Sequence, residues 1–323
     1  MSIISKKRRT VAALLAVCLT APAITVQAQQ QIRMIVANAA GSSVDSVART
    51  ISDPLSKALG QAIFVENIPG AGGTLGSAQL ARAPKDGNTL GMVSNNHVVN
   101  PSLYKSMSYD TLRDFAPVTI VAGSPIVLVA HPSVPANNLK ELIALAKSKP
   151  GEVNYGSSGN GTILHLTGEA LAHQAGIKLQ HIPYKGTGQL TSDVLGGQIQ
   201  LAFLGVTGAA PHIKSGRLKA LGVTTAARST LLPDVAPFAE QGLPNYNMQG
   251  WIALIAPAGV PDATVKKLYS TTKNLLATPE FNAALESQGF TPMGTTPEAT
   301  LGIFRNEMAQ AAELVRQSGM KID

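Results

Sequence analysis

Short apolar runs alternate with stretches of helical periodicity along the chain, and this alternation limits the possible folds more than any other feature. Residues 32–36 form the first apolar run, and a loop of small residues, 37–43, follows it. Apolar side chains then recur at the spacing of one helix face, at Val44, Val47, Ala48, Ile51, Leu55 and Leu59. Strands that alternate with helices in this way form βαβ units, so the sequence predicts an α/β architecture with a largely parallel sheet.

The same alternation of strands and helices restarts after the apolar run at residues 126–130. Further strands are expected at residues 62–66, 89–93, 126–130, 153–155, 178–182, 199–204, 218–224 and 251–256. Further helices are expected at residues 74–83, 139–148, 162–174, 191–195, 261–276 and 297–317. We therefore expect two domains, the first formed by residues 29–127 with 250–323 and the second by residues 128–249, with crossover strands near 126–130 and 249–256. Pro54 lies inside the first helical pattern, so that helix is expected to kink or restart near Asp53.

The first 28 residues have the order of a secretory signal peptide. A basic cluster at 6–9 precedes an apolar run at 11–19, and a small-residue pattern ends at Ala28. The apolar run is about half the length that spans a bilayer. The alternative is a buried N-terminal helix, but nothing in the segment caps one. We expect cleavage after Ala28 and a mature protein in the periplasm.

Cleavage at this point changes both the charge and the cysteine content. The leader contains four of the 26 Lys and Arg and none of the 19 Asp and Glu, so its removal lowers the formal charge from +7 to +3. That charge is too small to indicate a nucleic-acid partner. Cys18, the single cysteine, would also leave. Val17 stands where a lipoprotein signal prefers a small residue, so simple cleavage is favoured over lipidation. Disulfides and thiolate metal sites are excluded.

Two glycine–serine loops each follow an expected strand and begin a helix. One comprises Ala40, Gly41, Ser42, Ser43 and Asp45, and the other runs from residue 156 to Thr162. The unpaired N–H groups of a helix N-terminus hold a carboxylate without a formal cation, and serine hydroxyls add donors. The sequence therefore predicts an anion site between the two domains. The alternative is ordinary helix capping by Ser43, Asp45 or Thr162.

The sequence contains no complete motif for catalysis or for metal binding. Residues 156–160 lack the final glycine of a nucleophile elbow, and no P-loop is present. His165, Glu169 and His173 share one helix face, but a face two turns long cannot wrap one ion, so a solvated face is favoured. Trp251 either stacks on a ligand or packs in the core. Lys185 either pairs with an acid or is a solvated turn residue.

Several stretches of the chain resemble the solute-binding proteins of tripartite tricarboxylate transporters, also called the Bug family. They are GSSVDSVAR (41–49), VENIPGAGG (65–73), PKDGNTL (84–90), YDTLRDFAPV (109–118), YGSSGNGT (155–162), HIPYKG (181–186), DVLGGQ (193–198), SGRL (215–218) and APAG (256–259). They occur in the family's order over nearly the whole mature chain.

The resemblance implies a type II periplasmic-binding-protein fold, in which two α/β domains joined by crossover strands close on a small organic carboxylate. It also implies delivery to a two-component membrane permease. No cofactor, metal or catalytic residue is implied, and a monomer is expected. The implied ligand-binding residues are Ala40, Gly41, Ser42, Ser43, Asp45, Asn95, Ser157, Ser158, Gly159, Gly161, Thr162, Lys185 and Asp193. Asp45 is also expected to cap its helix and anchor the loop before it.

Three positions depart from the family pattern. Ala37 and Asn38 replace Pro-Phe or Pro-Tyr, and Asn88 replaces a common tyrosine. Leu204 stands where the family often carries an acid, which favours a plain carboxylate ligand over an amino acid. Two other functions remain open at this point. The protein could signal to a membrane sensor kinase, or it could be an exported hydrolase that uses Ser157 or Ser158.

Overall fold

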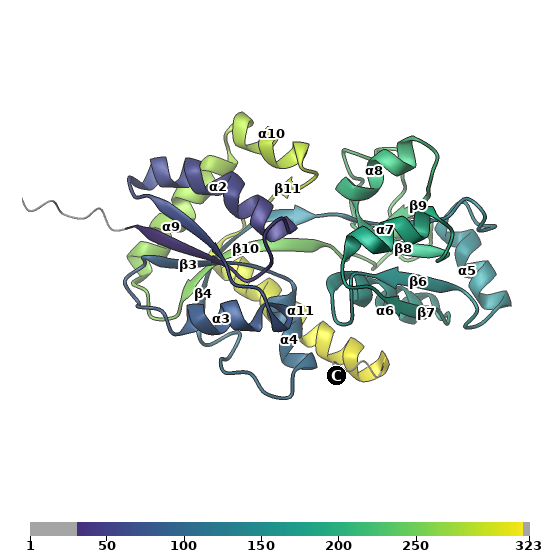
Figure 1. Cartoon of the computed structure of the whole chain (residues 1–323), viewed down its shortest axis with the longest axis horizontal. Helices are drawn as coiled ribbons and strands as arrows, with labels where there is room; N and C mark the ends of the chain where they lie inside the picture. The colour runs from purple at the N-terminus through teal and green to yellow at the C-terminus, as the bar shows by residue number, and fades with distance from the viewer. Residues whose placement is uncertain (1–30, 319–323) are drawn as a thin grey trace, which may run out of the picture. The chain divides into compact units, whose positions relative to one another are not determined.

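The computed structural model describes residues 31–318, which form two mixed β-sheets with helices packed against them (Figure 1). The first sheet has the strand order β11-β4-β10-β3-β1-β2. Its strands are β1 (Ile32–Val36), β2 (Ile63–Asn67), β3 (Thr89–Ser94), β4 (Phe115–Ser124), β10 (Gly250–Pro257) and β11 (Thr291–Pro292). Its helices are α2 (Ser43–Leu59), α3 (Thr74–Ala81), α4 (Asn96–Leu103), α9 (Asp262–Leu276), α10 (Pro279–Ser287) and α11 (Pro297–Ser318), with a short 3-10 turn η1 (Ala71–Gly73).

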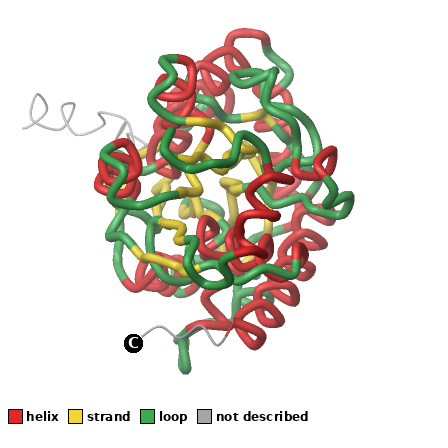
Figure 2. The backbone as a smooth tube through the Cα atoms, turned by 90° about the vertical axis from the view of Figure 1, so that its right-hand side faces the viewer, coloured by secondary structure: helices red, strands yellow, loops and turns green. Residues whose placement is uncertain are grey.

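The second sheet has the order β7-β6-β8-β5-β9. Its strands are β5 (Ile126–Ala130), β6 (Asn154–Ser157), β7 (Gln180–Pro183), β8 (Leu201–Gly205) and β9 (Lys219–Val223). Its helices are α5 (Leu139–Ser148), α6 (Ile163–Ala175), α7 (Thr187–Leu195) and α8 (Val206–Lys214), with a 3-10 turn η2 (Phe238–Gln241). Figure 2 shows the strands inside and the helices and loops around them. The expected signal peptide and Cys18 lie outside the described residues.

The sheets are less parallel than the sequence predicts. Where helices join successive strands, the pairs are parallel, as in β1 with β2 and β3, and β6 with β7 and β8. Strands β4, β5 and β10 instead pair antiparallel with their neighbours. β4 of the first sheet leads into β5 of the second through Pro125 alone, so no helix separates these two strands. β5 and β10 therefore run against the βαβ strands of their sheets, whereas β4, antiparallel to β10, runs in the same direction as β3.

The chain passes between the two sheets at two places. The first is Pro125, between β4 and β5. The second lies between β9 and β10, where the Met248 amide donates to the Thr224 carbonyl at 2.9 Å and the Thr224 hydroxyl donates back to the Met248 carbonyl at 2.6 Å. The chain thus passes from one sheet to the other close to the domain boundaries expected at 127–128 and 249–250. The division into two domains stays a prediction.

Helix α2 shows why the first sheet is stable despite an interior proline. The helix runs without a break through Pro54, so the restart expected near Asp53 is wrong, and the alternative, a kink at that point, stays a prediction. Ser42 caps its start, and Gly60 ends it with φ of 70°. Its apolar face is buried against the sheet. Burial of each large apolar side chain contributes about 1.5–3 kcal/mol, which offsets the one backbone hydrogen bond that proline removes.

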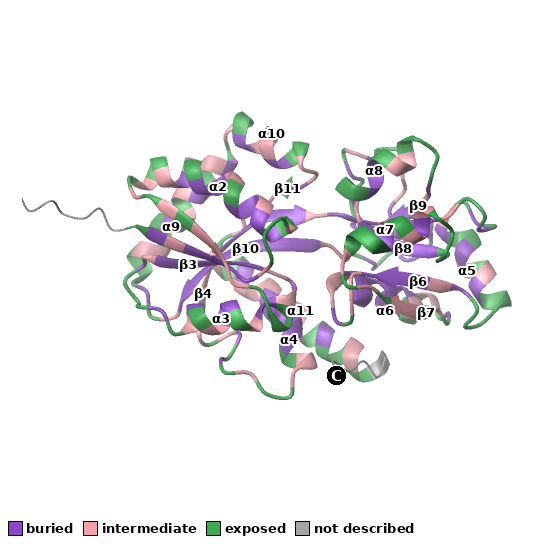
Figure 3. Ribbon diagram, viewed as in Figure 1, coloured by how far each residue is buried: buried purple, intermediate pink, exposed green. Residues whose placement is uncertain are grey.

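The apolar core lies on both faces of each sheet. Every residue of β5 and β10 is buried (Figure 3), as expected for strands covered by helices on both sides. Trp251 in β10 is buried and stacks on Phe304 of α11, with ring centroids 4.9 Å apart. Of the two expectations for Trp251, packing in the core is the one observed. None of the helices within residues 31–318 is long and apolar enough to cross a bilayer.

Candidate functional site

Three helices begin around one pocket of about 420 Å³. The start of α2 contributes Gly41, Ser42, Ser43 and Ser46. The first turns of α7 and α8 contribute Thr187, Thr191, Gly205, Thr207 and Gly208, and the wall is completed by Ser124, Leu204, Gln288 and Phe290. Residues from both sheets therefore line it.

The residues that line the pocket supply many hydrogen-bonding groups and no charged side chain. Every side chain that lines it is a hydroxyl, an amide, an apolar group or a glycine hydrogen, with no Asp, Glu, Lys, Arg or His among these described residues. A helix N-terminus carries unpaired N–H donors and a partial positive charge of roughly half an elementary charge. Such a site suits the oxygens of a carboxylate, whereas an ammonium group would find no anion there.

Asp45 fixes the loop at the start of α2. Its carboxylate is buried and accepts from the Gly41 amide at 2.9 Å, from Asn67 Nδ2 at 2.9 Å and from Arg49 Nε at 3.0 Å. Burial alone would raise the pKa of Asp45, but these hydrogen bonds together hold it below its ordinary value. Gly41 turns the chain with φ of 78°, a conformation that favours glycine. Asp45 therefore anchors the loop, as expected, with both oxygens bonded to protein donors, but the residue that caps α2 is Ser42 and not Asp45.

The second glycine–serine loop satisfies most of its polar groups internally. Ser157 is fully buried, accepts from the Gly159 amide at 3.2 Å and lies 2.7 Å from His181 Nε2. Thr162 caps α6, and the Gly161 amide donates to His165 Nδ1 at 3.1 Å. None of these residues, nor half-buried Ser158, lines the 420 Å³ pocket.

The helix face that carries His165 is not the solvated face expected from the sequence. His165 is buried with its ring stacked on His181, centroids 3.6 Å apart. Glu169 is half-buried and accepts from the Tyr155 hydroxyl at 2.8 Å. Burial lowers the pKa of His181 to about 4. Only His173 of the three is exposed, because the face turns from the core to the surface along α6.

The remaining predicted residues lie away from the pocket. Asn95 is buried at the start of α4 and accepts from the Trp251 amide at 2.8 Å. Asp193 is half-buried and accepts from the Tyr184 hydroxyl at 3.0 Å, and Lys185 is exposed. Of the predicted set, the structure brings Gly41, Ser42 and Ser43 together in the pocket. Exposed Ala40 is next to them in the chain.

The sequence analysis missed the contribution of α8. Residues 205–208, Gly-Val-Thr-Gly, follow a buried strand and begin a helix, which is the same signal that identified the first loop. It was overlooked because Pro211 and the small residues weaken the helical period. Ser124 and Gln288 gave no local signal, since only the fold brings them to the pocket.

Comparison with known proteins identifies the family. The model of the tripartite tricarboxylate transporter family receptor, TctC, matches residues 47–320. The chain belongs to this family. Among curated proteins, BugT of Bordetella pertussis is 35% identical over 293 residues, which is 90% of each chain. This TctC receptor is therefore a solute-binding protein of the Bug type, and not an enzyme.

Solved structures of related proteins share the fold. A periplasmic transporter is 37% identical with a TM-score of 0.79, covering 92% of this chain and all of its own. Rpa4515 of Rhodopseudomonas palustris with adipate is 29% identical with a TM-score of 0.80, covering 91% of this chain and 99% of its own. MatC of the same organism with malate is 28% identical with a TM-score of 0.74, covering 88% and 98%. The hydrolase alternative is excluded, because the family is one of binding proteins.

Proposed function

We propose that the 420 Å³ pocket binds one carboxylate of a small dicarboxylate, and that the protein delivers this ligand to a two-component membrane permease. The observation that supports this most directly is the meeting of three helix N-termini in a wall without a charged side chain. A volume of 420 Å³ has room for about 14 water-sized groups, enough for a six-carbon diacid. Adipate and malate, the ligands of two relatives, have this chemistry.

The pocket also favours a plain acid over an amino acid. Leu204, where the family often carries an acid, lines the wall and is buried. An ammonium group placed there would lose its hydration without gaining an anion, at a cost of several kcal/mol. Three or four charge-assisted hydrogen bonds of about 1.5–3 kcal/mol each, less the cost of association, correspond to micromolar binding of a carboxylate.

In this proposal, the predicted ligand-binding residues that lie outside the pocket form a second wall around the ligand. The turn that contains Ser157, Ser158, Gly159, Gly161 and Thr162 follows β6, and Lys185 follows β7. Ligands of open α/β sheets bind outside the carboxyl ends of the parallel strands, which is where these turns lie. We propose that they reach the ligand when the two domains close, with Asp193 and Asn95 in supporting roles. We also propose that residues 1–28 direct export to the periplasm.

Titration calorimetry tests the proposal on the mature protein. We expect adipate or malate to bind at micromolar concentrations and glutamate to bind at least about tenfold more weakly, because of the uncompensated ammonium group. Thr187→Val removes from the wall a hydroxyl that bonds to no described protein group and is expected to weaken acid binding about tenfold. Ser270→Ala, a change at an exposed serine of α9, serves as the matched control. Equal binding of all three ligands, or no loss in Thr187→Val, would contradict the assignment of this pocket.

A further inference from the structure

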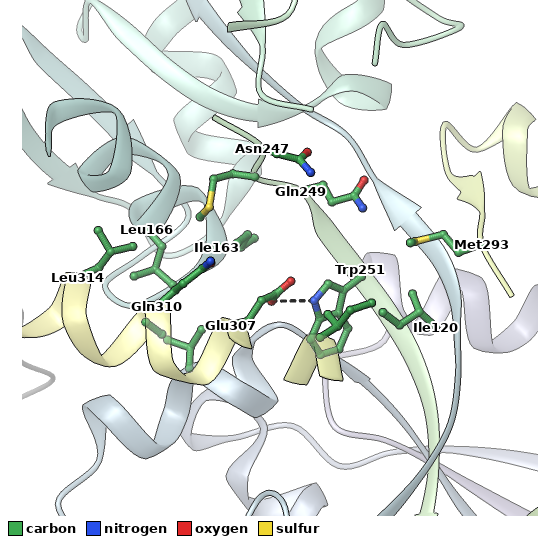
Figure 4. A pocket seen from close by; sticks show the side chains of 14 residues that line it. Ile120, Ile163, Leu166, Asn247, Gln249, Trp251, Met293, Glu307, Gln310 and Leu314 are labelled. Carbon is green, nitrogen blue, oxygen red and sulfur yellow. Dashed lines mark hydrogen bonds between the residues drawn. The ribbon is translucent and has the colours of Figure 1, made fainter. Parts of the chain in front are cut away.

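A second cavity, of about 220 Å³, is lined by a carboxylate, one oxygen of which accepts no hydrogen bond from the described residues. The cavity lies against α11 and shares no lining residue with the 420 Å³ pocket. Much of its wall is apolar, including Ile120, Ile163, Leu166, Met248, Met293 and Trp251. Glu307 of α11 is the only titratable side chain among the described residues that line it. Figure 4 shows its carboxylate beside the Trp251 indole, below Gln249 and Asn247.

The two oxygens of Glu307 differ in their partners. Oε2 accepts from Trp251 Nε1 at 2.8 Å and from Asn95 Nδ2 at 2.9 Å. Oε1 has no hydrogen-bond partner among the described residues, and no Lys, Arg or His of residues 31–318 forms an ion pair with this carboxylate. Asn95 in turn accepts from the Trp251 amide, so the bonded oxygen is held in place by a fixed network.

This arrangement leaves a charge without compensation. Burial raises the pKa of Glu307, while the bonds from Trp251 and Asn95 oppose that rise. An ionised carboxylate that lies against an apolar wall without a nearby cation lowers the stability of the folded protein. Binding of a positive group or uptake of a proton removes this loss. Side-chain amides of Asn247, Gln249 and Gln310 line the same cavity, and their oxygens can accept further N–H groups.

We propose that this cavity binds a small organic cation, a primary amine with a compact hydrocarbon body. The ammonium group donates to Glu307 Oε1 and to neighbouring amide oxygens, and the hydrocarbon lies against Leu166, Met248 and the apolar wall. A volume of 220 Å³ holds about seven water-sized groups, which limits the body to the size of one six-membered ring. The proposal goes beyond carboxylate binding and does not depend on it.

The cavity has an approach from the surface. A neighbouring hollow of about 450 Å³ shares Asn247, Met248, Gln310 and Leu314 with it. That hollow is bordered by exposed residues of α6 and α11, among them His173 and Gln174. A ligand of the stated size can therefore enter between α6 and α11 without passing the carboxylate pocket.

The test compares two probes of one shape on the mature wild-type protein. Cyclohexylamine carries the cation, and cyclohexanol is its neutral counterpart. Trp251 is the only tryptophan of the chain and donates to Glu307, so its fluorescence reports directly on this cavity. We expect cyclohexylamine to change that fluorescence and to bind at least about tenfold more tightly than cyclohexanol. Equal affinities, or no response to the amine, would overturn the proposal.

Variants separate the carboxylate from the cavity. Glu307→Gln is expected to lower amine affinity to that of the alcohol, whereas Glu298→Gln, an exposed glutamate of the same helix, is expected to leave it unchanged. Ala311→Met fills the cavity from its wall and is expected to abolish binding of both probes while the Glu307 hydrogen bonds stay intact. If Glu307→Gln does not fold, Ala311→Met and the probe pair decide. Unchanged amine binding in Ala311→Met, or in a folded Glu307→Gln, would refute the site. Loss of dicarboxylate binding alone would refute only the proposed function.

Discussion

At the scale of single residues, buried polar groups fall into two kinds. Asp45 and Ser157 are fully engaged by neighbouring protein groups and so determine where loops lie. His97 instead keeps a buried atom without a partner, Nε2, and half-buried Glu307 has one oxygen, Oε1, that accepts no hydrogen bond from the described residues. An unpaired buried group costs stability that a partner or a change of protonation state can recover. These two residues therefore carry the clearest consequences for pH and for ligands.

His97 predicts a loss of stability in mild acid. It is 3% exposed, among the rings of Tyr109, Phe115 and Phe304, and burial lowers its pKa from 6.5 to about 4. Since the unfolded chain binds this proton at a higher pH than the folded one, stability is full above 6.5 and falls as the pH drops toward 4. The loss that belongs to His97 is about 3 kcal/mol at most.

Urea unfolding at several pH values from 7 to 4 measures this effect. His97→Leu is expected to reduce the pH dependence, because the apolar replacement has no proton to gain, while His181, whose pKa burial also lowers to about 4, still contributes to it. His173→Leu, at an exposed histidine, is expected to keep the wild-type slope. Identical slopes in wild type and His97→Leu would show that His97 does not titrate in this range.

At the scale of elements, the sequence specifies strands and amphipathic helices well and their pairing poorly. The apolar period of residues 44–59 gives α2 within one residue, because burial of that face dominates. Helices α4, α8 and α10 were not predicted, since prolines and small residues blur their periods. β4 was not predicted as a strand at all, and the antiparallel pairing of β5 and β10 was missed, because strand direction depends on connections that a local pattern does not contain.

The candidate site divides in the same way. Gly41, Ser42 and Ser43 were predicted from a local signal, a glycine–serine loop between a strand and a helix. Ser124 and Gln288 reach the pocket only through the packing of segments far apart in the chain. The sequence could therefore indicate the chemistry of an anion site and one of its walls. It could not identify which second-domain loop completes the wall.

Pro54 of α2 provides a test at this scale. Proline in a helix interior removes one backbone hydrogen bond and costs about 3 kcal/mol relative to alanine, although it also restricts the unfolded chain by about 1 kcal/mol. Because α2 is unbroken, Pro54→Ala should raise the free energy of unfolding by about 1–2 kcal/mol. Chemical denaturation measures the change, with Lys57→Ala, at an exposed position of α2, as control. A destabilised Pro54→Ala would show that the ring's packing outweighs the backbone bond.

At the scale of the whole molecule, two kinds of connection join the sheets. The chain crosses at Pro125 and again next to the pair formed by Thr224 and Met248. Helix α11 adds a third link, since it packs on α4 and β4 of the first sheet and also contacts α6 of the second. Relative motion of the domains must therefore bend the two crossings and slide α6 along the end of α11.

Ligand binding should drive this motion. The 420 Å³ pocket takes α2 from one sheet and α7 and α8 from the other, so a carboxylate held by all three helix starts favours the arrangement that brings them closest. We expect saturating adipate or malate, whichever calorimetry shows to bind, to lower the radius of gyration measured by small-angle X-ray scattering. The double variant Ser43→Ala with Thr187→Val removes a donor from each side and should show no such decrease, while Ser270→Ala should behave as wild type. Ligand binding without any contraction would mean that the pocket is already closed in the free protein. Closure would then not bring the Ser157–Thr162 turn to the ligand.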